Sequence, residues 1–209
     1  MGNLTTEFTE IFEKEVIPKR ADAKNLLNYL NSTTFFDDPA SARKHSSFEH
    51  GLVLHSINVY TSLKKMIKTF PNNYTEDSIA IVSLLHDVCK IGTYEKTARN
   101  KKEYITDGNF NNYKGYQIKK DELGKFVWKS ELSYQNIDPF PYGHGEKSVY
   151  IISKYMKLTD EEAQAIRFHM GMTIESDKFY CSNCYENNPL ALALHWADEY
   201  AAYIIEKGN

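Results

Sequence analysis

The sequence predicts a mainly α-helical protein with a single domain. Apolar residues recur at helical spacing along most of the chain, and cap residues stand where this spacing begins and ends. One section, residues 92–143, lacks the spacing and is the exception. The chain has 209 residues and an apolar content of 42%, which is enough to bury one substantial core.

Four helices are predicted before the exceptional section. The first two cover about residues 5–16 and 21–30. The third covers about residues 48–69, and its apolar stripe consists of Leu52, His55, Val59, Leu63 and Met66. The fourth begins after Thr75 and continues to Gly92. Because the fourth is apolar nearly all round, we expect it to be a central, buried helix.

The section 92–143 is predicted to be a small β-hairpin insert. Two runs alternate in strand fashion, residues 115–119 and 125–129, with the sequence DELG between them. The aromatic residues of the insert include Tyr94, Tyr104, Tyr113, Tyr116, Phe126 and Trp128. Together with nearby lysines, these rings would either stack a base and hold phosphates, or pack the hairpin onto the helical body.

Helices resume after the insert. They are predicted over residues 145–156, from Thr159 onward, and over residues 188–205. Thr159 and Glu162 have the spacing of a capping box, and the last helix begins with a cap residue followed by proline. No repeat or linker divides the chain, so we expect one domain in which residues 1–43 supply the N-terminal helices.

Charge and cysteine content narrow the class of partner. A net charge of -3 gives no general attraction to long duplex nucleic acid. A small phosphorylated substrate or a short single strand of nucleic acid remains as a possible partner. Three cysteines, an odd number, are typical of a reducing cytoplasm. Cys181 and Cys184 have the spacing of half a zinc site without a second half, so we interpret them as a loop detail. No apolar run approaches the roughly 18 residues of a membrane helix, and we expect no membrane partner.

The clearest chemical signal is a histidine followed by an aspartate on the most apolar helix. His86 and Asp87 would be costly to bury there without a cation or a hydrogen-bonded partner. A core histidine beside a hydrogen-bonded aspartate would explain this pair in isolation. His55 and Asp198, however, lie on the apolar stripes of two other predicted helices. Three buried helices that each point a nitrogen or oxygen ligand inward predict one shared divalent-metal site.

These residues resemble a known signature. His55 lies in GLVLHSINV, His86 and Asp87 lie in SLLHDVCKIGTYE, and Asp198 lies in ALHWADEYAAY. Their order and flanks resemble the H…HD…D signature of the HD superfamily of metal-dependent phosphohydrolases, over about residues 44–203, with the insert as the least similar part. The resemblance implies a helical bundle of HD type that holds one or two divalent ions (Mn, Fe, Ni, Co, Zn or Mg).

Two further histidines resemble the extra ligands of HD members with two metals. His144 precedes one predicted helix, and His169 ends the helix that starts after Thr159. The resemblance implies that they hold a second ion and that Asp87 bridges the two ions. Met170 follows His169, at a position where many two-metal relatives have a second histidine. The number of bound ions, one or two, therefore stays open. The alternative for His144 is a loop histidine without a metal, and the alternative for His169 is a histidine that interacts with the dipole at a helix C-terminus.

Three more residues are assigned to the surroundings of the metal. Lys90 lies four residues after the histidine of the HD pair, so it shares that helix face, and the resemblance implies that it faces the substrate phosphate; a solvated lysine is the alternative. His195 stands one turn before Asp198, as a hydrogen-bonding neighbour of a ligand or phosphate or as a core histidine. His50 resembles a family position but lies about 140° around the helix from His55, so we do not expect it to bind the same ion.

The expected function is hydrolysis of a phosphomonoester or phosphodiester by metal-activated water. Asp87 and Lys90 are the expected catalytic residues. A nucleotide, a cyclic nucleotide or a short oligonucleotide is the expected substrate. Two alternatives use the same fold: a nucleotide-sensing HD module without turnover, and a di-iron oxygenase.

Overall fold

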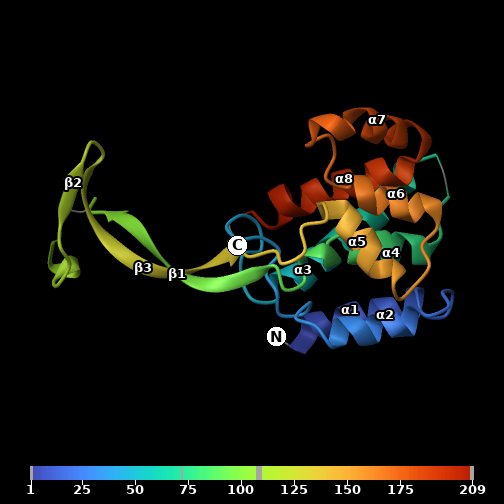
Figure 1. The fold of residues 1–209 in the computed structure, drawn as a ribbon, viewed down its shortest axis with the longest axis horizontal. Helices are drawn as coiled ribbons and strands as arrows, with labels where there is room; N and C mark the ends of the chain where they lie inside the picture. Colours follow the sequence, from blue (N-terminus) through green and yellow to red (C-terminus); the bar gives the residue numbers. More distant parts are fainter. Residues whose placement is uncertain (1, 72, 107–109, 208–209) are drawn as a thin grey trace.

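The computed structural model describes residues 2–71, 73–106 and 110–207. Within these residues the chain is mainly α-helical, as predicted, with eight α-helices and a small antiparallel sheet (Figure 1). The helices are α1 (Gly2–Glu15), α2 (Ala23–Asn31), α3 (Gly51–Met66), α4 (Glu76–Leu85), α5 (His144–Ser153), α6 (Asp160–Phe168), α7 (Lys178–Asn187) and α8 (Pro189–Tyr200). Among the described residues, no helix combines the length and the apolar content needed to cross a bilayer.

The core of the helical body is built around α3 and α4. Every residue of α4 from Ile79 to Leu85 is buried, which confirms the predicted central helix. It packs against α1, α3 and α6, while α3 also packs against α8. On the predicted stripe of α3, the residues Leu52, His55, Val59 and Leu63 are fully buried. The predicted capping box of Thr159 and Glu162 is also present at the start of α6.

The fourth helix is shorter than predicted. It ends at Leu85 rather than continuing to Gly92, and Asp87 leaves the helical conformation with φ -108° and ψ 16°. A 3-10 helix, Val88–Lys90, follows. The buried apolar pattern runs on through Val88 and Cys89, so spacing alone does not mark this break. The prediction that Lys90 shares a helix face with the HD histidine is therefore wrong.

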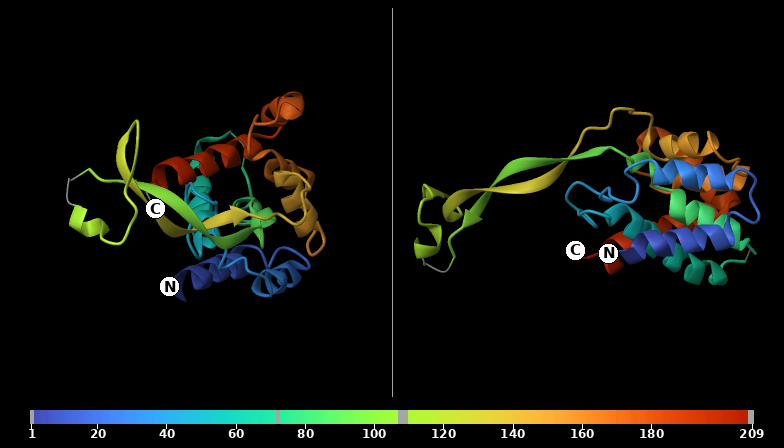
Figure 2. Two further views of the ribbon diagram at one scale, coloured as in Figure 1. Left: turned by 60° about the vertical axis from the view of Figure 1, so that its left-hand side comes forward. Right: turned by 90° about the horizontal axis from the view of Figure 1, so that it is seen from below.

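The insert forms a long two-stranded arm that projects from the helical body (Figures 1 and 2). Strand β1 (Tyr94–Tyr104) pairs in antiparallel fashion with β3 (Gly124–Asn136), and β2 (Lys119–Asp121) pairs with the far end of β3. The hairpin turn is confirmed between Asp121 and Gly124. The predicted strand 115–119 is wrong, since pairing begins only at Lys119. The main partner, β1, was not predicted because it is exposed on both faces and so shows no alternation.

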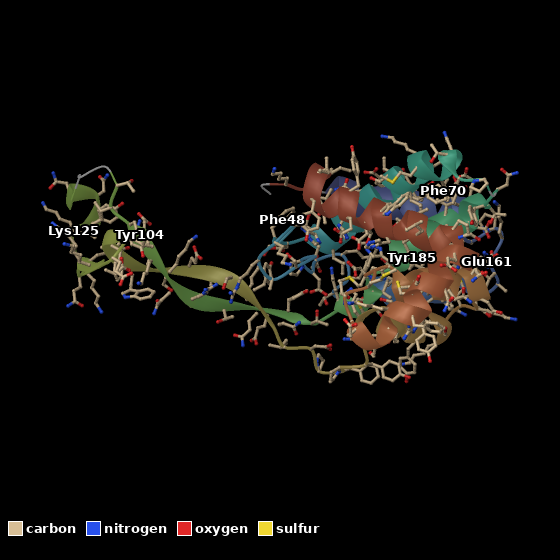
Figure 3. All side chains as sticks on the ribbon, turned by 90° about the horizontal axis from the view of Figure 1, so that it is seen from above. Phe48, Phe70, Tyr104, Lys125, Glu161 and Tyr185 are labelled. Atoms are coloured by element: carbon tan, nitrogen blue, oxygen red, sulfur yellow. The ribbon has the colours of Figure 1, made fainter. Side chains whose placement is uncertain are left out.

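The aromatic residues at the end of the arm pack within the arm. The Phe126 ring lies 5.7 Å from both the Tyr104 and the Trp128 rings, and the Lys102 ammonium lies 4.4 Å above the Phe126 ring. Figure 3 shows Tyr104 and Lys125 at the far end of the arm, away from the helices. The alternative in which these rings pack the hairpin onto the helical body is therefore wrong for this end of the arm.

Cys181 and Cys184 lie in α7 and not in a loop, which corrects their interpretation. Both are buried free cysteines, and α7 packs against α6 and α8. Within the described residues neither cysteine belongs to a group that could hold a metal ion. Burial raises the pKa of the Cys184 thiol to about 11. These cysteines therefore serve as small apolar packing residues.

Candidate metal centre

The six predicted ligands meet where the helices of the body converge. They come from the middle of α3, the end of α4, the start of α5, the end of α6 and the second half of α8 (Figure 1). They are His55, His86, Asp87, His144, His169 and Asp198, and all but His144 are buried. Buried histidine and aspartate groups that could hold a metal ion are therefore present, although their residues are far apart in the sequence.

The first group of ligands surrounds the two inner histidines. His55 Nε2 lies 3.0 Å from Asp198 Oδ1 and 3.3 Å from His86 Nε2. Asp87 Oδ2 lies 3.3 Å from His86 Nε2 and 3.6 Å from His55 Nε2. The ligand atoms of His55, His86 and Asp198 thus lie within 4.8 Å of one another, with Asp87 Oδ2 beside the two imidazoles. Such nitrogen and oxygen ligands suit a divalent transition metal.

The second group uses the other oxygen of Asp87. Asp87 Oδ1 lies 2.8 Å from His144 Nε2 and 3.6 Å from His169 Nε2. The two imidazoles meet because Gly145 has no side chain: a Cβ there would overlap the Arg167 carbonyl at the end of α6. One oxygen of Asp87 therefore faces His55 and His86 and the other faces His144 and His169, as a bridging ligand would. The two sets adjoin, since His86, Asp87 and His169 also have ligand atoms within 4.8 Å of one another.

Hydrogen bonds fix the orientation of the three buried imidazoles. In each ring Nδ1 faces a carbonyl or carboxylate oxygen, so Nδ1–H donates and Nε2 is left toward the centre. For His55, His86 and His169 in turn, the acceptors are Glu206 Oε1 at 3.0 Å, Ser83 O at 2.8 Å and Ile166 O at 2.6 Å. This second set of contacts is typical of metal-binding histidines.

The surroundings of one buried nitrogen atom indicate whether the residues fit a metal ion. His169 is fully buried, and its Nε2 has no hydrogen-bond partner; the nearest carboxylate oxygen, on Asp87, is 3.6 Å away. Leaving such an atom unsatisfied costs about 1–3 kcal/mol. A cation between His169 and Asp87 would satisfy the lone pair. The residues present therefore fit a bound divalent ion.

The electrostatics of the centre also favour a cation. Burial alone would raise the pKa of Asp87, but Lys90 and His86 hold that pKa well below its usual range. The pKa of Asp198 is likewise lowered against the effect of burial, mainly by His55. The pKa of His55 is raised to about 9, because hydrogen bonds to Asp198 and Glu206 outweigh burial. Ionised carboxylates thus stay in the core and attract positive charge.

Lys90 closes one side of the centre. Its Nζ lies 2.6 Å from Asp87 Oδ2, reached across the turn of the 3-10 helix. Lys90 also lines a pocket of about 230 Å³ beside the centre, together with Tyr94, His144 and Lys147. The side chain of His144 is 34% exposed. A ligand in this pocket would therefore contact both the lysine and the second metal group.

Sequence reasoning missed Glu206. A π-helical turn, Ala201–Ile205, follows α8 and adds one residue to that turn. Glu206 and Asp198 consequently both face His55, while Ile205, the apolar residue just before Glu206, is 43% exposed. A regular helical period cannot reveal this placement, and the only signal was an acidic residue at the end of an apolar stretch.

Two other side chains, those of His45 and Cys89, lie next to the centre although the sequence did not predict them there. The His45 ring lies 4.8 Å from the His55 ring, and His45 Nε2 is buried without a partner. Burial lowers the pKa of His45 to about 4, with His55 adding to the shift. Cys89 Sγ lies 3.5 Å from His144 Nδ1, and burial raises the pKa of this thiol to about 12. Cys89 is thus a neutral neighbour of the second group.

The remaining predicted residues occupy different places. His195 Nδ1–H donates to the main-chain oxygen of His169 at 2.7 Å, so it holds the end of α6 next to a candidate ligand. His50 lies at the start of α3 with φ 69°, and its Nδ1–H donates to Phe36 O at 2.7 Å. The contacts of His50 are thus with the preceding loop and not with the metal centre.

Comparisons with known proteins give no match to this chain among family models, curated proteins or solved structures.

Proposed function

We propose that this protein is an HD-type, metal-dependent phosphohydrolase that cleaves a phosphate ester of a nucleotide, cyclic nucleotide or short oligonucleotide. The observation that supports this most directly is the placement of Asp87. One of its oxygens faces His55 and His86, and the other faces His144 and His169. Hydrolysis of phosphate esters is a reaction for which paired metal ions are suited.

In this proposal the two groups hold two divalent ions. His55, His86, Asp87 and Asp198 would hold the first ion, and Asp87, His144 and His169 would hold the second. The mixed nitrogen and oxygen ligands accept Mn, Fe, Ni, Co, Zn or Mg according to supply and geometry. When bound, such ions lower the pKa of a coordinated water and neutralise charge on a phosphoryl group.

The protein's own side chains orient the substrate. Lys90 points into the centre and lines the adjoining pocket, so its ammonium can contact a non-bridging phosphate oxygen and stabilise the charge that develops there. Lys147 lines the same pocket, and both lysines have a carboxylate 2.6 Å from Nζ, Asp87 for Lys90 and Asp138 for Lys147. Lys90 is assigned the phosphate contact because its partner Asp87 belongs to the metal centre, whereas Asp138 does not.

Substitution of the shared carboxylate tests the proposal. Asp87→Asn and Asp198→Asn are compared with Asp77→Asn, which removes a buried aspartate outside the centre. Hydrolysis is measured with Mn²⁺ on p-nitrophenyl phosphate, bis(p-nitrophenyl) phosphate, cyclic nucleotides and oligonucleotides, and circular dichroism checks folding. We expect the centre variants to lose at least about a thousandfold in kcat/KM, and the Asp77→Asn variant to remain active.

Other outcomes would contradict hydrolysis in specific ways. Full metal-stimulated activity in a folded Asp87→Asn variant would exclude the centre as the active site. Bound metal and bound nucleotide without any turnover would favour the sensing module. Oxygen consumption by the protein loaded with ferrous iron, without phosphate release, would favour the di-iron oxygenase.

A further inference from the structure

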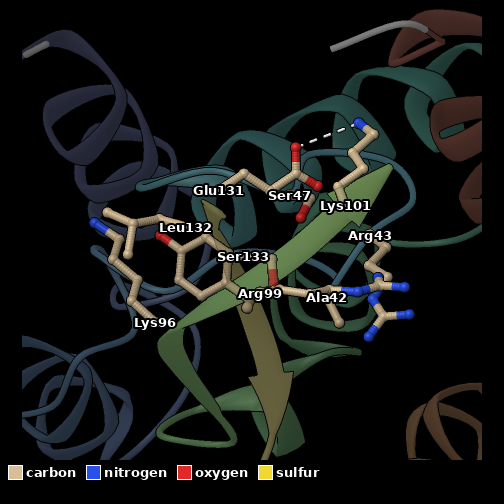
Figure 4. Close-up of a pocket in the computed structure, with 10 residues that line it drawn as sticks. Ala42, Arg43, Ser47, Lys96, Arg99, Lys101, Glu131, Leu132 and Ser133 are labelled. Atoms are coloured by element: carbon tan, nitrogen blue, oxygen red, sulfur yellow. Dashed lines mark hydrogen bonds and ion pairs between the residues drawn. The ribbon is translucent and has the colours of Figure 1, made fainter. Parts of the chain in front are cut away.

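A second hollow lies at the base of the arm and not at the metal centre. It has a volume of about 510 Å³ and lies between the loop before α3 and the first part of the β1–β3 ribbon (Figure 4). Its lining is mostly polar and basic, and includes Arg43, Ser47, Lys96, Arg99, Lys101 and Tyr134. Nothing in the proposed hydrolytic chemistry requires this hollow.

The charges of the hollow are only partly neutralised. Lys101 Nζ lies 3.3 Å from Glu131, an ion pair visible in Figure 4, and Lys96 Nζ lies 3.1 Å from Glu49. Arg43 and Arg99 form no ion pair within the described part of the chain. Guanidinium groups bind phosphate in a two-pronged geometry that ammonium groups lack. The hollow therefore offers two guanidinium groups that have no ion-pair partner among the described residues, although Glu131, which pairs with Lys101, stands opposite Arg99 in the strand register.

The hollow and the metal centre adjoin each other. Along the arm, the pair Tyr94–Asn136 lines the pocket at the centre, and the pair Lys96–Tyr134 lines the hollow. Two residues of strand span only about 7 Å. In the loop before α3, Arg43 stands two residues before His45, whose ring contacts His55. A ligand longer than one nucleotide can therefore reach both places.

A group of exposed rings flanks the pocket at the centre. The Phe140 and Tyr142 rings are stacked with centroids 5.2 Å apart, and Tyr150 lies 5.2 Å from Tyr142. All three are at least 40% exposed. Phe140 and Tyr142 stand on either side of Pro141, which lines that pocket. Exposed aromatic faces bind nucleobases by stacking, whatever the base.

We propose that the hollow binds the phosphodiester backbone of a single-stranded oligonucleotide whose scissile phosphate lies at the metal centre. This inference rests on the proposed hydrolytic function and names its substrate class. Arg43 and Arg99 hold phosphates on one side of the scissile bond, and the exposed rings near Pro141 stack a base. The rings favour a nucleotide strand over inorganic polyphosphate, because polyphosphate has no face to stack.

Binding without turnover tests the inference directly. A fluorescein-labelled, short single-stranded oligonucleotide is titrated with protein in EDTA, and anisotropy gives the Kd at several salt concentrations. The double variant R43Q/R99Q is compared with K119Q/K120Q, which removes two exposed cations from β2. Each phosphate contact contributes about 0.7 to the slope of log K against log salt for single strands. We expect R43Q/R99Q to bind at least about tenfold more weakly and with a slope smaller by about 1.4.

Activity then separates this inference from the proposed function. For R43Q/R99Q, we expect kcat/KM to fall more for the oligonucleotide than for bis(p-nitrophenyl) phosphate. Unchanged affinity and slope, or an equal loss in K119Q/K120Q, would overturn the inference. So would inorganic polyphosphate that binds wild-type protein as tightly as the oligonucleotide. Hydrolysis of the small diester without oligonucleotide binding would overturn this inference and leave the proposed hydrolytic function intact. Oligonucleotide binding that depends on the hollow, without any hydrolysis, would support the strand-binding hollow and overturn the proposed hydrolytic function.

Discussion

Glu206 Oε1 lies 3.0 Å from His55 Nδ1, and Asp198 Oδ1 lies 3.0 Å from Nε2 of the same ring. The imidazole is thus held between two carboxylates, one within α8 and one just after the π-helical turn that follows it. Glu206 also accepts hydrogen bonds from Ser46 and Asn58, so its own position is fixed. The orientation of a candidate metal ligand on α3 therefore depends on a residue that does not face the metal.

Glu206→Ala should weaken metal binding without removing a ligand. Loss of such a supporting carboxylate typically costs 10–100-fold in metal affinity, and we expect a loss of about this size. Competition with a fluorescent chelator measures the Kd. Glu199→Ala, which removes an exposed carboxylate nearby, is the control and should bind like wild type. Equal affinity in all three proteins would show that Glu206 does not support His55.

His169→Gln should reduce the number of bound ions from two to one per chain. Its ligand atom lies near those of Asp87 and His86, whereas His55, His86 and Asp198 form a candidate group that is complete without it. Inductively coupled plasma mass spectrometry measures metal per chain after gel filtration. His50→Gln, whose imidazole bonds Phe36 outside the centre, should retain both ions. Retention of two ions by His169→Gln would remove this histidine from the ligand set.

Lys90→Gln should lower kcat/KM by about 10²–10³-fold, the usual cost of losing one group that stabilises transition-state charge. Metal content should be retained, since Lys90 is not a ligand. Lys157→Gln, at an exposed position, controls for the loss of one positive charge. Equal losses of metal and activity in Lys90→Gln would instead mean that the lysine only maintains the centre.

Arg20→Met should destabilise the fold by about 3 kcal/mol at neutral pH, because it removes the guanidinium that pairs with two buried carboxylates and leaves them only weaker contacts, such as Lys19 at 3.5 Å from Asp77. Arg20 bonds Asp77 on α4 and Glu162 on α6. Burial raises the pKa of Asp77, but hydrogen bonds from Thr75 and Arg20 lower it overall. A lowered folded-state pKa gives stability that is present above the unfolded-state value and lost as pH falls. The difference from wild type in urea unfolding should therefore shrink below about pH 4; a difference independent of pH would contradict this assignment.

Removal of the arm should leave the helical body folded. In a variant in which an Asn-Gly turn joins Thr97 to Ser133, the buried apolar residues removed, among those whose burial is described, are Phe126 and Val127, which pack in the arm. We expect its Tm to change by only a few degrees and its metal content to remain, while oligonucleotide binding weakens. Unfolding of this variant at room temperature would show that the arm is part of the core.

The sequence allowed the helical body to be predicted wherever burial imposes a period. The stripe of α3 and the apolar surface of α4 are examples, since both are set by packing against neighbours. Four ligands, His55, His86, Asp87 and Asp198, could be predicted because buried polar residues on apolar helices are costly without a partner. His144 and His169 were predicted only from the resemblance to HD proteins with two metals. Strand β1 could not be predicted, because its stability comes from backbone pairing with β3 and not from a buried face. Glu206 was missed for a related reason: the π-helical turn shifts the period that would have pointed to it.

Anomalous diffraction from crystals soaked in Mn²⁺ tests the central claim most directly. We expect one peak among His55, His86, Asp87 and Asp198, and a second peak among Asp87, His144 and His169. Both should disappear in Asp87→Asn crystals. Folded protein without any peak at these residues, at saturating Mn²⁺, would contradict the claim and leave the cluster as a polar core.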